Sequence, residues 1–231
     1  GVFLSVLYML FFRREIVEGV HVLARRRKET VDPPDPGRRT VRQWLSGWGI
    51  CAPRQFVLYT TIGFIDVAVR NAVTVFLGFA LIERGVADNE LGWLMSLTFF
   101  GGAGGKLVCG ILVGRWGSRS VILVTEILMI LGCLAMPFVP TGWLMLIFLP
   151  VLGFVLNGTS SVIYIGLAPT FTREQRSRGY ALYYTTNFFS AAISPFLFGL
   201  VGDAFGLGAI FFGAGLVMTM GLPLVFFVRD G

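Results

Sequence analysis

The 231-residue sequence has few charged residues, a single histidine and three cysteines. Only 14% of its residues are Asp, Glu, Lys or Arg, whereas soluble domains carry about 25%. Because His21 is the lone imidazole, a histidine-based catalytic or metal site is not supported. Cys109 and Cys133 lie inside apolar runs, and with Cys51 the count is odd, so no disulfide framework is indicated. The sequence predicts no enzyme, cofactor or metal site.

Apolar residues dominate instead, at 55% of the chain with a mean hydropathy of +0.76. A helix needs roughly 20 mainly apolar residues to cross a bilayer. Six runs of this kind lie at about 55–82, 91–114, 120–139, 142–168, 179–202 and 206–228. We therefore predict an all-α membrane protein with six transmembrane helices and the lipid bilayer as its surroundings. Residues 1–12 are also apolar but cover only about 18 Å as a helix, so we interpret them as the end of a truncated transmembrane helix.

The net charge of +6 is concentrated in alternate loops. Ten of the 19 Lys and Arg residues lie in 13–54, and others cluster at 115–119 and 169–178 and at Arg229. Under the positive-inside rule these loops and the C-terminus are cytoplasmic. This pattern favours a multi-pass protein of a bacterial inner membrane over a nucleic-acid-binding protein. Residues 13–54 are predicted to be a cytoplasmic central loop that begins with a short amphipathic helix, and 55–231 a six-helix bundle.

A basic, glycine-rich turn joins the second and third runs. Its marked residues are Gly110, Gly114, Arg115, Gly117 and Arg119. The same spacing recurs in 199–206, between the fifth and sixth runs. Because three spans reverse the direction of the chain, this echo predicts two inverted three-helix repeats, which are typical of secondary transporters.

The turn resembles the loop signature of the major facilitator superfamily, Gly-x-x-x-Asp-Arg-x-Gly-Arg-Arg. Gly114 stands where the family usually has Asp, which puts its usual cytoplasmic latch in doubt, and Ser118 stands where it usually has Arg. Residues 156–203 are similar to the tenth and eleventh spans of bacterial members. The first span resembles the seventh span of the drug-efflux branch related to fosmidomycin-resistance proteins. The resemblance implies the C-terminal half of a twelve-helix fold, with residues 1–12 ending helix six and a six-helix N-terminal half as its partner.

Two charged residues share one face of the first span. Asp66 and Arg70 are four residues apart, and a charge at a helix centre costs about 2.5–3.5 kcal/mol. We predict that Asp66 carries a proton and that Arg70 modulates it or contacts an anionic substrate. The alternative is an internal ion pair that only lowers the insertion cost.

Lys106 and Glu126 lie ten residues before and after Trp116, near the midpoint of the hairpin. Equal depth in an antiparallel hairpin predicts an intramembrane ion pair. We expect this pair to be a structural staple, with a proton relay as the alternative.

Polar and aromatic residues form stripes on two later spans. Aromatic rings offer apolar contact and cation–π surface, which suits amphipathic or cationic solutes. These stripes predict walls of a substrate pathway, with helix packing or interface anchoring as the alternative. Their members, with the polar residue that follows Arg70, are Asn71, Asn157, Ser161, Tyr164, Tyr180, Tyr183, Tyr184 and Asn187.

The predicted function is secondary active transport of a small organic solute by alternating access, as a proton-coupled antiporter in efflux. A polytopic sensor or a membrane-embedded enzyme is the alternative. An enzyme should show intramembrane His/Asp clusters or a soluble catalytic domain, and this sequence has neither.

Overall fold

A computed structural model describes residues 48–228. The predicted truncated helix at 1–12 and most of the central loop at 13–54 lie outside the described residues. The bundle begins at Pro53, two residues before the predicted start.

Five long helices make up the described part: α4 (Pro53–Glu83), α5 (Asp88–Ala135), α6 (Trp143–Leu167), α7 (Arg176–Phe205) and α8 (Leu207–Val225). Single turns of 3₁₀ helix, η1 (Met136–Phe138) and η2 (Ala168–Thr170), follow α5 and α6. All five are long and apolar enough to cross a membrane. Helices are expected because backbone groups inside a bilayer must find their hydrogen bonds within the segment. The chain is thus an integral multi-pass membrane protein.

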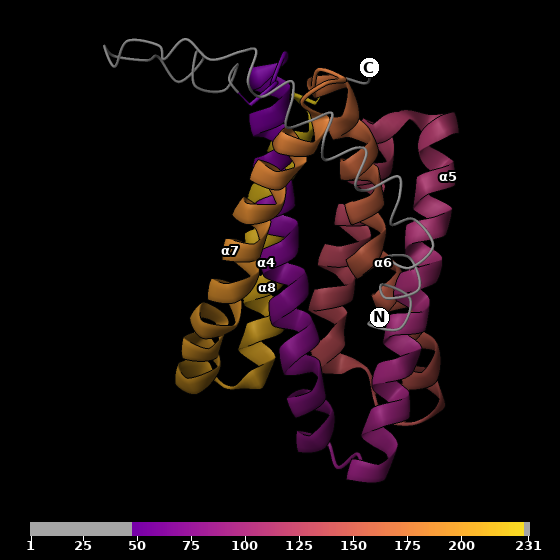
Figure 1. Ribbon diagram of the computed structural model, residues 1–231. Coiled ribbons are helices and arrows are strands. Elements are labelled where there is room, and N and C mark those ends of the chain that lie inside the picture. The colour runs from indigo at the N-terminus through magenta and orange to yellow at the C-terminus, as the bar shows by residue number, and fades with distance from the viewer. Residues whose placement is uncertain (1–47, 229–231) are drawn as a thin grey trace, which may run out of the picture. The chain divides into compact units, whose positions relative to one another are not determined.

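The six predicted spans fit into five helices because α5 contains two of them. Its 48 residues include Gly117, whose backbone (φ 76°, ψ 161°) is not helical. Figure 1 shows α5 turning back on itself at its upper end. Gly206 joins α7 to α8 with a similar backbone (φ 88°, ψ 164°). The last glycine of each echoed motif therefore makes the turn between two spans, in a conformation that L side chains rarely adopt.

The core consists of two apolar clusters separated by polar side chains. One cluster includes Leu77, Met129 and Leu149, and the other includes Phe56 and Val162. Between the two clusters, α4, α5, α6 and α7 carry the buried polar residues that we call the polar layer: Asp66, Thr125, Glu126, Thr159, Asn187 and Ser190. A buried polar layer at mid-helix is costly, and it therefore marks the part of the bundle where function is expected.

Hydrogen bonds tie part of this layer together. The Thr159 hydroxyl donates to Thr125 Oγ1 at 3.0 Å, which joins α6 to α5. The Ser190 hydroxyl donates to the Phe64 carbonyl at 2.6 Å, which joins α7 to α4. The two carboxyl groups of the layer, by contrast, have oxygens without partners.

The first span of α5 packs directly against the backbone of α6. A Cβ atom added at Gly105 would overlap the Phe154 carbonyl oxygen, and one added at Gly153 would overlap the Thr98 carbonyl oxygen. The neighbouring Gly104 faces open space. Small residues thus permit a helix approach that any side chain would prevent.

The segment before α4 is fastened to the connection between α6 and α7. Ile50 and Phe171 form an isolated antiparallel bridge. The Cys51 amide donates to the Thr170 carbonyl at 2.9 Å, and the Thr172 amide donates to the Gly49 carbonyl at 2.8 Å. We call this set of contacts the clamp, because it holds the segment before α4 against the connection between α6 and α7.

Candidate functional site

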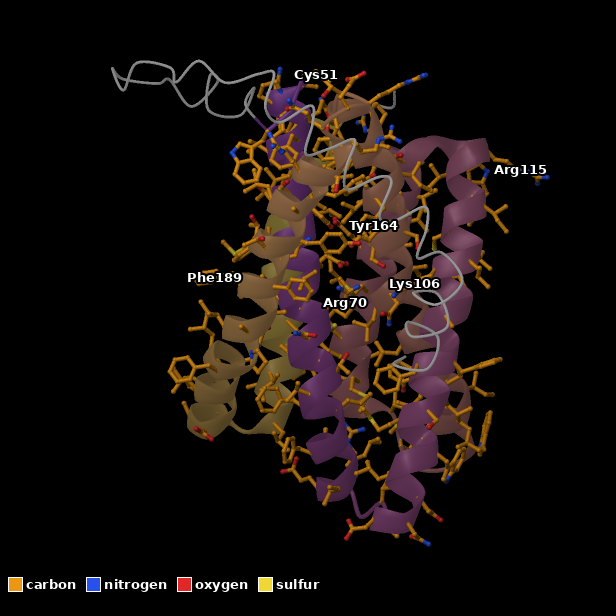
Figure 2. All side chains as sticks on the ribbon, in the orientation of Figure 1. Cys51, Arg70, Lys106, Arg115, Tyr164 and Phe189 are labelled. Atoms are coloured by element: carbon orange, nitrogen blue, oxygen red, sulfur yellow. The ribbon has the colours of Figure 1, made fainter. Side chains whose placement is uncertain are left out.

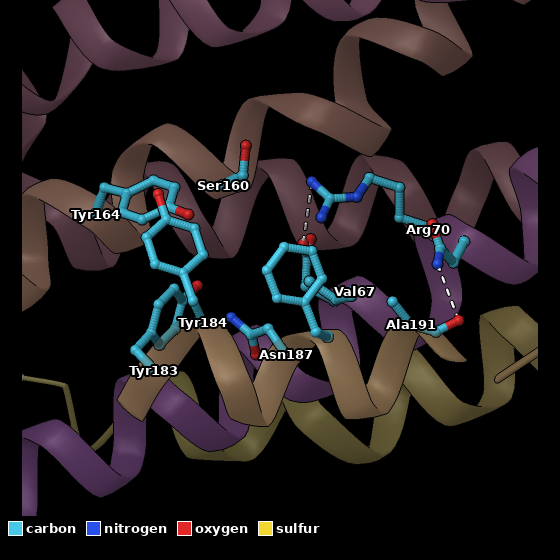
Figure 3. A pocket seen from close by; sticks show the side chains of 11 residues that line it. Val67, Arg70, Ser160, Tyr164, Tyr183, Tyr184, Asn187 and Ala191 are labelled. Carbon is cyan, nitrogen blue, oxygen red and sulfur yellow. Dashed lines mark hydrogen bonds and ion pairs between the residues drawn. The ribbon is translucent and has the colours of Figure 1, made fainter. Parts of the chain in front are cut away.

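A cavity of about 400 Å³ lies beside the polar layer, between α4, α6 and α7. Figure 3 shows its side chains from all three helices. Its lining residues are Asp66, Val67, Arg70, Asn71, Ser160, Tyr164, Tyr183, Tyr184, Asn187, Phe188 and Ala191. The structure therefore brings seven predicted site residues from three spans to one place: Asp66, Arg70, Asn71, Tyr164, Tyr183, Tyr184 and Asn187.

Asp66 and Arg70 form a loose ion pair at one end of the lining. Arg70 Nη1 lies 3.9 Å from Asp66 Oδ2, which is too far for a hydrogen bond. The Asp66 side chain is 1% exposed, and neither of its oxygens accepts a hydrogen bond from any described residue. Arg70 is 19% exposed and reaches into the cavity (Figure 3). The pair predicted from sequence exists, but its hydrogen-bonding capacity is unused.

Tyrosines build the opposite end of the cavity. The Tyr164 ring lies 5.6 Å from that of Tyr183, 5.4 Å from that of Tyr184 and 6.0 Å from that of Tyr180, centroid to centroid. The Tyr180 hydroxyl donates to the Tyr164 carbonyl at 2.8 Å, which fixes the cluster to α6. Tyr164 and Tyr184 also line a second cavity with Ser177, Tyr180 and Ala181. These two tyrosines therefore stand between the main cavity and a space toward the start of α7.

Neutral polar groups complete the lining. Asn71 Nδ2 donates to the Ala191 carbonyl at 3.0 Å and so joins α4 to α7. Asn187 is 7% exposed, and its Oδ1 has no partner among residues 48–228. An unpaired buried amide oxygen beside a cavity is available to a hydroxyl group of a ligand.

Three predicted pathway residues do not line the main cavity: Asn157, Ser161 and Tyr180, and the last of these lines the second cavity. Asn157 packs against Gly102 of α5 and donates to the Gly153 carbonyl at 3.2 Å. Ser160 takes the cavity position expected for Ser161. One residue along a helix rotates a side chain by about 100°, and the polarity pattern alone did not distinguish the two serines. The spacing of four between Ser160 and Tyr164 was the signal that could have found it.

The predicted Lys106–Glu126 ion pair is wrong. Within residues 48–228 the one ion pair is that of Asp66 and Arg70. Lys106 is exposed, whereas Glu126 is 1% exposed and its Oε2 has no hydrogen-bond partner. The charged neighbour that acts on Glu126 is Asp66. The two residues face different sides of their spans, because equal depth does not fix the rotation of a helix about its axis.

Separate roles for these residues give a stability prediction. Glu126→Met, which removes a buried carboxyl group without partners, should stabilise the complete protein by about 1–3 kcal/mol. Lys106→Met is the matched control, and the double variant should equal the sum of the two within about 0.5 kcal/mol. The measurement is the thermal denaturation midpoint in detergent. A deviation from additivity clearly larger than about 0.5 kcal/mol would show that Lys106 and Glu126 interact as an ion pair.

The glycine-rich turn lies in the middle of α5, where its two spans meet. Arg115 projects outward there in Figure 2, and the Arg119 guanidinium lies 5.4 Å from the centre of the Phe226 ring. Gly110 and Gly114 face open space. An arginine over an aromatic face links the start of the third span to the end of α8.

This order of helices, with its two glycine turns and its mid-bundle cavity, agrees with the family comparison. Residues 59–231 match the model of the Major Facilitator Superfamily. The chain belongs to this superfamily.

The chain is also similar to proteins that are named as sugar or metabolite transporters. A D-xylose-proton symporter-like protein of Arabidopsis thaliana is 28% identical over 174 residues, which are 73% of this chain and 30% of that protein. A D-xylose transporter of Levilactobacillus brevis is 28% identical over 158 residues, 64% of this chain and 35% of the relative. A putative metabolite transport protein of Bacillus subtilis is 33% identical over 87 residues, 38% and 18% of the two chains. The chain thus spans about a third or less of these relatives.

Proposed function

We propose that this chain is the C-terminal half of a secondary transporter that moves a small hydroxylated solute of sugar type together with protons. The observation that carries this proposal is the cavity beside the polar layer, where a buried carboxyl group without hydrogen-bond partners meets neutral polar and aromatic side chains. An N-terminal six-helix half would supply the other wall, and the two halves would rock around the site.

The composition of the cavity supports a hydroxylated solute. Asn71, Asn187 and Ser160 offer amide and hydroxyl groups, and Tyr164 and Tyr184 offer ring faces. A sugar presents hydroxyl groups at its rim and an apolar face of C–H groups, and this combination matches both kinds of wall. The names of the relatives support the same class.

Asp66 is the proposed proton carrier. An ionised carboxylate at 1% exposure without hydrogen-bond donors is costly, and a bound proton removes that cost. Arg70 at 3.9 Å favours the ionised form. Burial and Arg70 therefore favour opposite protonation states of Asp66. A carboxyl group that can exchange its proton beside a solute cavity is what coupling requires.

Orientation is proposed from the loop charges. The turn at 115–119, the loop at 169–178 and the C-terminus would face the cytoplasm, in a bacterial inner membrane. Gly114 offers no carboxylate at the position of the superfamily's loop acid, so this turn would not form the usual latch.

The test uses the complete transporter in proteoliposomes with radiolabelled D-xylose and D-glucose. An imposed gradient that is acidic outside should drive accumulation of a sugar above its external concentration, and a protonophore should abolish the accumulation. No uptake of either sugar, nor of a sugar acid, would contradict the proposed substrate class.

Proton-coupled efflux of an amphipathic solute, as in the drug-efflux branch, is the second candidate. The tyrosine cluster around Tyr164 favours it, because aromatic walls also accept apolar and cationic molecules. In the same vesicles an antiporter would release a preloaded dye against its gradient when the outside is acidic. Sugar accumulation with no effect on the dye would reject this candidate.

A further inference from the structure

The guanidinium of Arg70 has hydrogen-bond donors that no protein group uses within the described residues. It lines the cavity, and it donates no hydrogen bond to any residue of the described range. A guanidinium carries five N–H donors in a planar fork that matches a carboxylate. Among residues 48–228 the one ion-pair partner of Arg70 is Asp66, with Oδ2 at 3.9 Å. The fork is therefore left open toward the cavity.

Charge balance in the cavity depends on the proton of Asp66. With Asp66 ionised, the Arg70–Asp66 pair is neutral and offers nothing to an anion. With Asp66 protonated, the pair carries one positive charge in a largely desolvated site, where electrostatic attraction is much stronger than in water. A ligand with one negative charge then restores neutrality. A neutral sugar leaves the positive charge uncompensated.

The remaining groups around the pair do not disturb this balance. The other titratable side chains of the lining are the phenols of Tyr164, Tyr183 and Tyr184, and a phenol carries no charge at physiological pH. Glu126 of α5 is the other buried acid of the polar layer, and it does not line the cavity. The helix α8 contains no titratable residue in Leu207–Val225.

We infer that the substrate is a hydroxylated monocarboxylate, a sugar acid, whose carboxylate binds Arg70 while Asp66 holds the co-transported proton. The hydroxyl groups of the solute would meet Asn71, Asn187 and the tyrosine cluster at the other end of the cavity. One anion and one proton cross together, so each transport cycle moves no net charge. This inference rests on the proposed transport of a sugar-type solute and names its class.

D-Glucuronate and D-glucose provide the test, because they differ in a carboxylate in place of one CH₂OH group. In proteoliposomes of the complete wild-type transporter, D-glucuronate should show a KM lower than that of D-glucose by about tenfold or more, the effect of a charged hydrogen bond. Its affinity should rise as the pH falls, since protonation of Asp66 frees Arg70. Its uptake under a pH gradient should not respond to a potassium–valinomycin potential.

Two variants of Arg70 and one control variant test the role of the guanidinium directly. Arg70→Gln should raise the KM for D-glucuronate by about tenfold or more, and by a clearly larger factor than it raises the KM for D-glucose. Arg70→Lys keeps the charge but loses the fork, so it should fall between wild type and Arg70→Gln. Arg173→Gln removes the same charge at an exposed loop position outside the cavity and should match wild type.

The outcomes separate this inference from the proposed function. Uptake of D-glucose or D-xylose with no preference for D-glucuronate would overturn the sugar-acid assignment and leave sugar transport standing. D-Glucuronate uptake that carries net charge would overturn the pairing of one anion with one proton. Transport of none of these compounds would overturn the proposed function and this inference together.

Discussion

The variant Asp66→Asn in the complete transporter is expected to lose proton-driven accumulation entirely while it still exchanges solute across the membrane. Asparagine has nearly the shape of aspartate but cannot take up and release a proton. The cavity should therefore keep its lining, and the rocking of the two halves should continue without coupling to the pH gradient. The measurements are uphill uptake under a gradient that is acidic outside and counterflow at equal pH on both sides.

The pH dependence of Asp66→Asn supplies the internal control. Solute binding should become independent of pH over the range in which the wild-type affinity changes, since the titrating group has been removed. Asn71→Asp, at the residue that follows Arg70, adds an acid without removing Asp66 and should keep a pH-dependent uptake. Wild-type accumulation by Asp66→Asn would show that the coupling proton binds elsewhere.

The second large effect is expected on stability, at the contact of α5 with α6. Gly105→Ala should destabilise the protein by about 1–3 kcal/mol, because its Cβ would overlap the Phe154 carbonyl oxygen and the two backbones would have to separate. Gly104→Ala is the matched control on the adjacent residue. It meets open space and should be neutral or stabilising by up to about 1 kcal/mol through helix propensity.

Thermal denaturation midpoints in one detergent would check this pair of variants. Gly153→Ala, which would overlap the Thr98 carbonyl oxygen from the α6 side, should behave like Gly105→Ala. Equal midpoints for Gly104→Ala and Gly105→Ala would mean that the helices do not approach as closely as described.

The spans and their turns could be predicted from the sequence because the bilayer leaves few choices. Apolar runs of sufficient length must be helices, and the structure places a helical span at each of the six runs. The repeated residue spacing that ends at Gly117 and at Gly206 was informative for a similar reason, since both positions require a backbone that favours glycine. The neighbourhood of Asp66 and Arg70 followed from spacing within one helix.

Contacts between helices were harder to predict from the sequence. The hairpin argument gave Lys106 and Glu126 the same depth, but depth says nothing about which side of a span each residue faces. Glu126 turned into the polar layer and Lys106 to an exposed face. The choice of Ser160 over Ser161 depended on the same unknown rotation of α6. Such rotations are fixed by packing between helices, which no single stretch of sequence contains.

The clamp at the start of the bundle has a mechanical consequence. Because Gly49 and Cys51 are bonded to Thr172 and Thr170, a force applied to the chain ahead of residue 48 divides between α4 and the connection of α6 with α7. Those three helices are the ones that surround the cavity. A displacement of residues 48–52 is therefore passed to all three walls of the cavity through these hydrogen bonds.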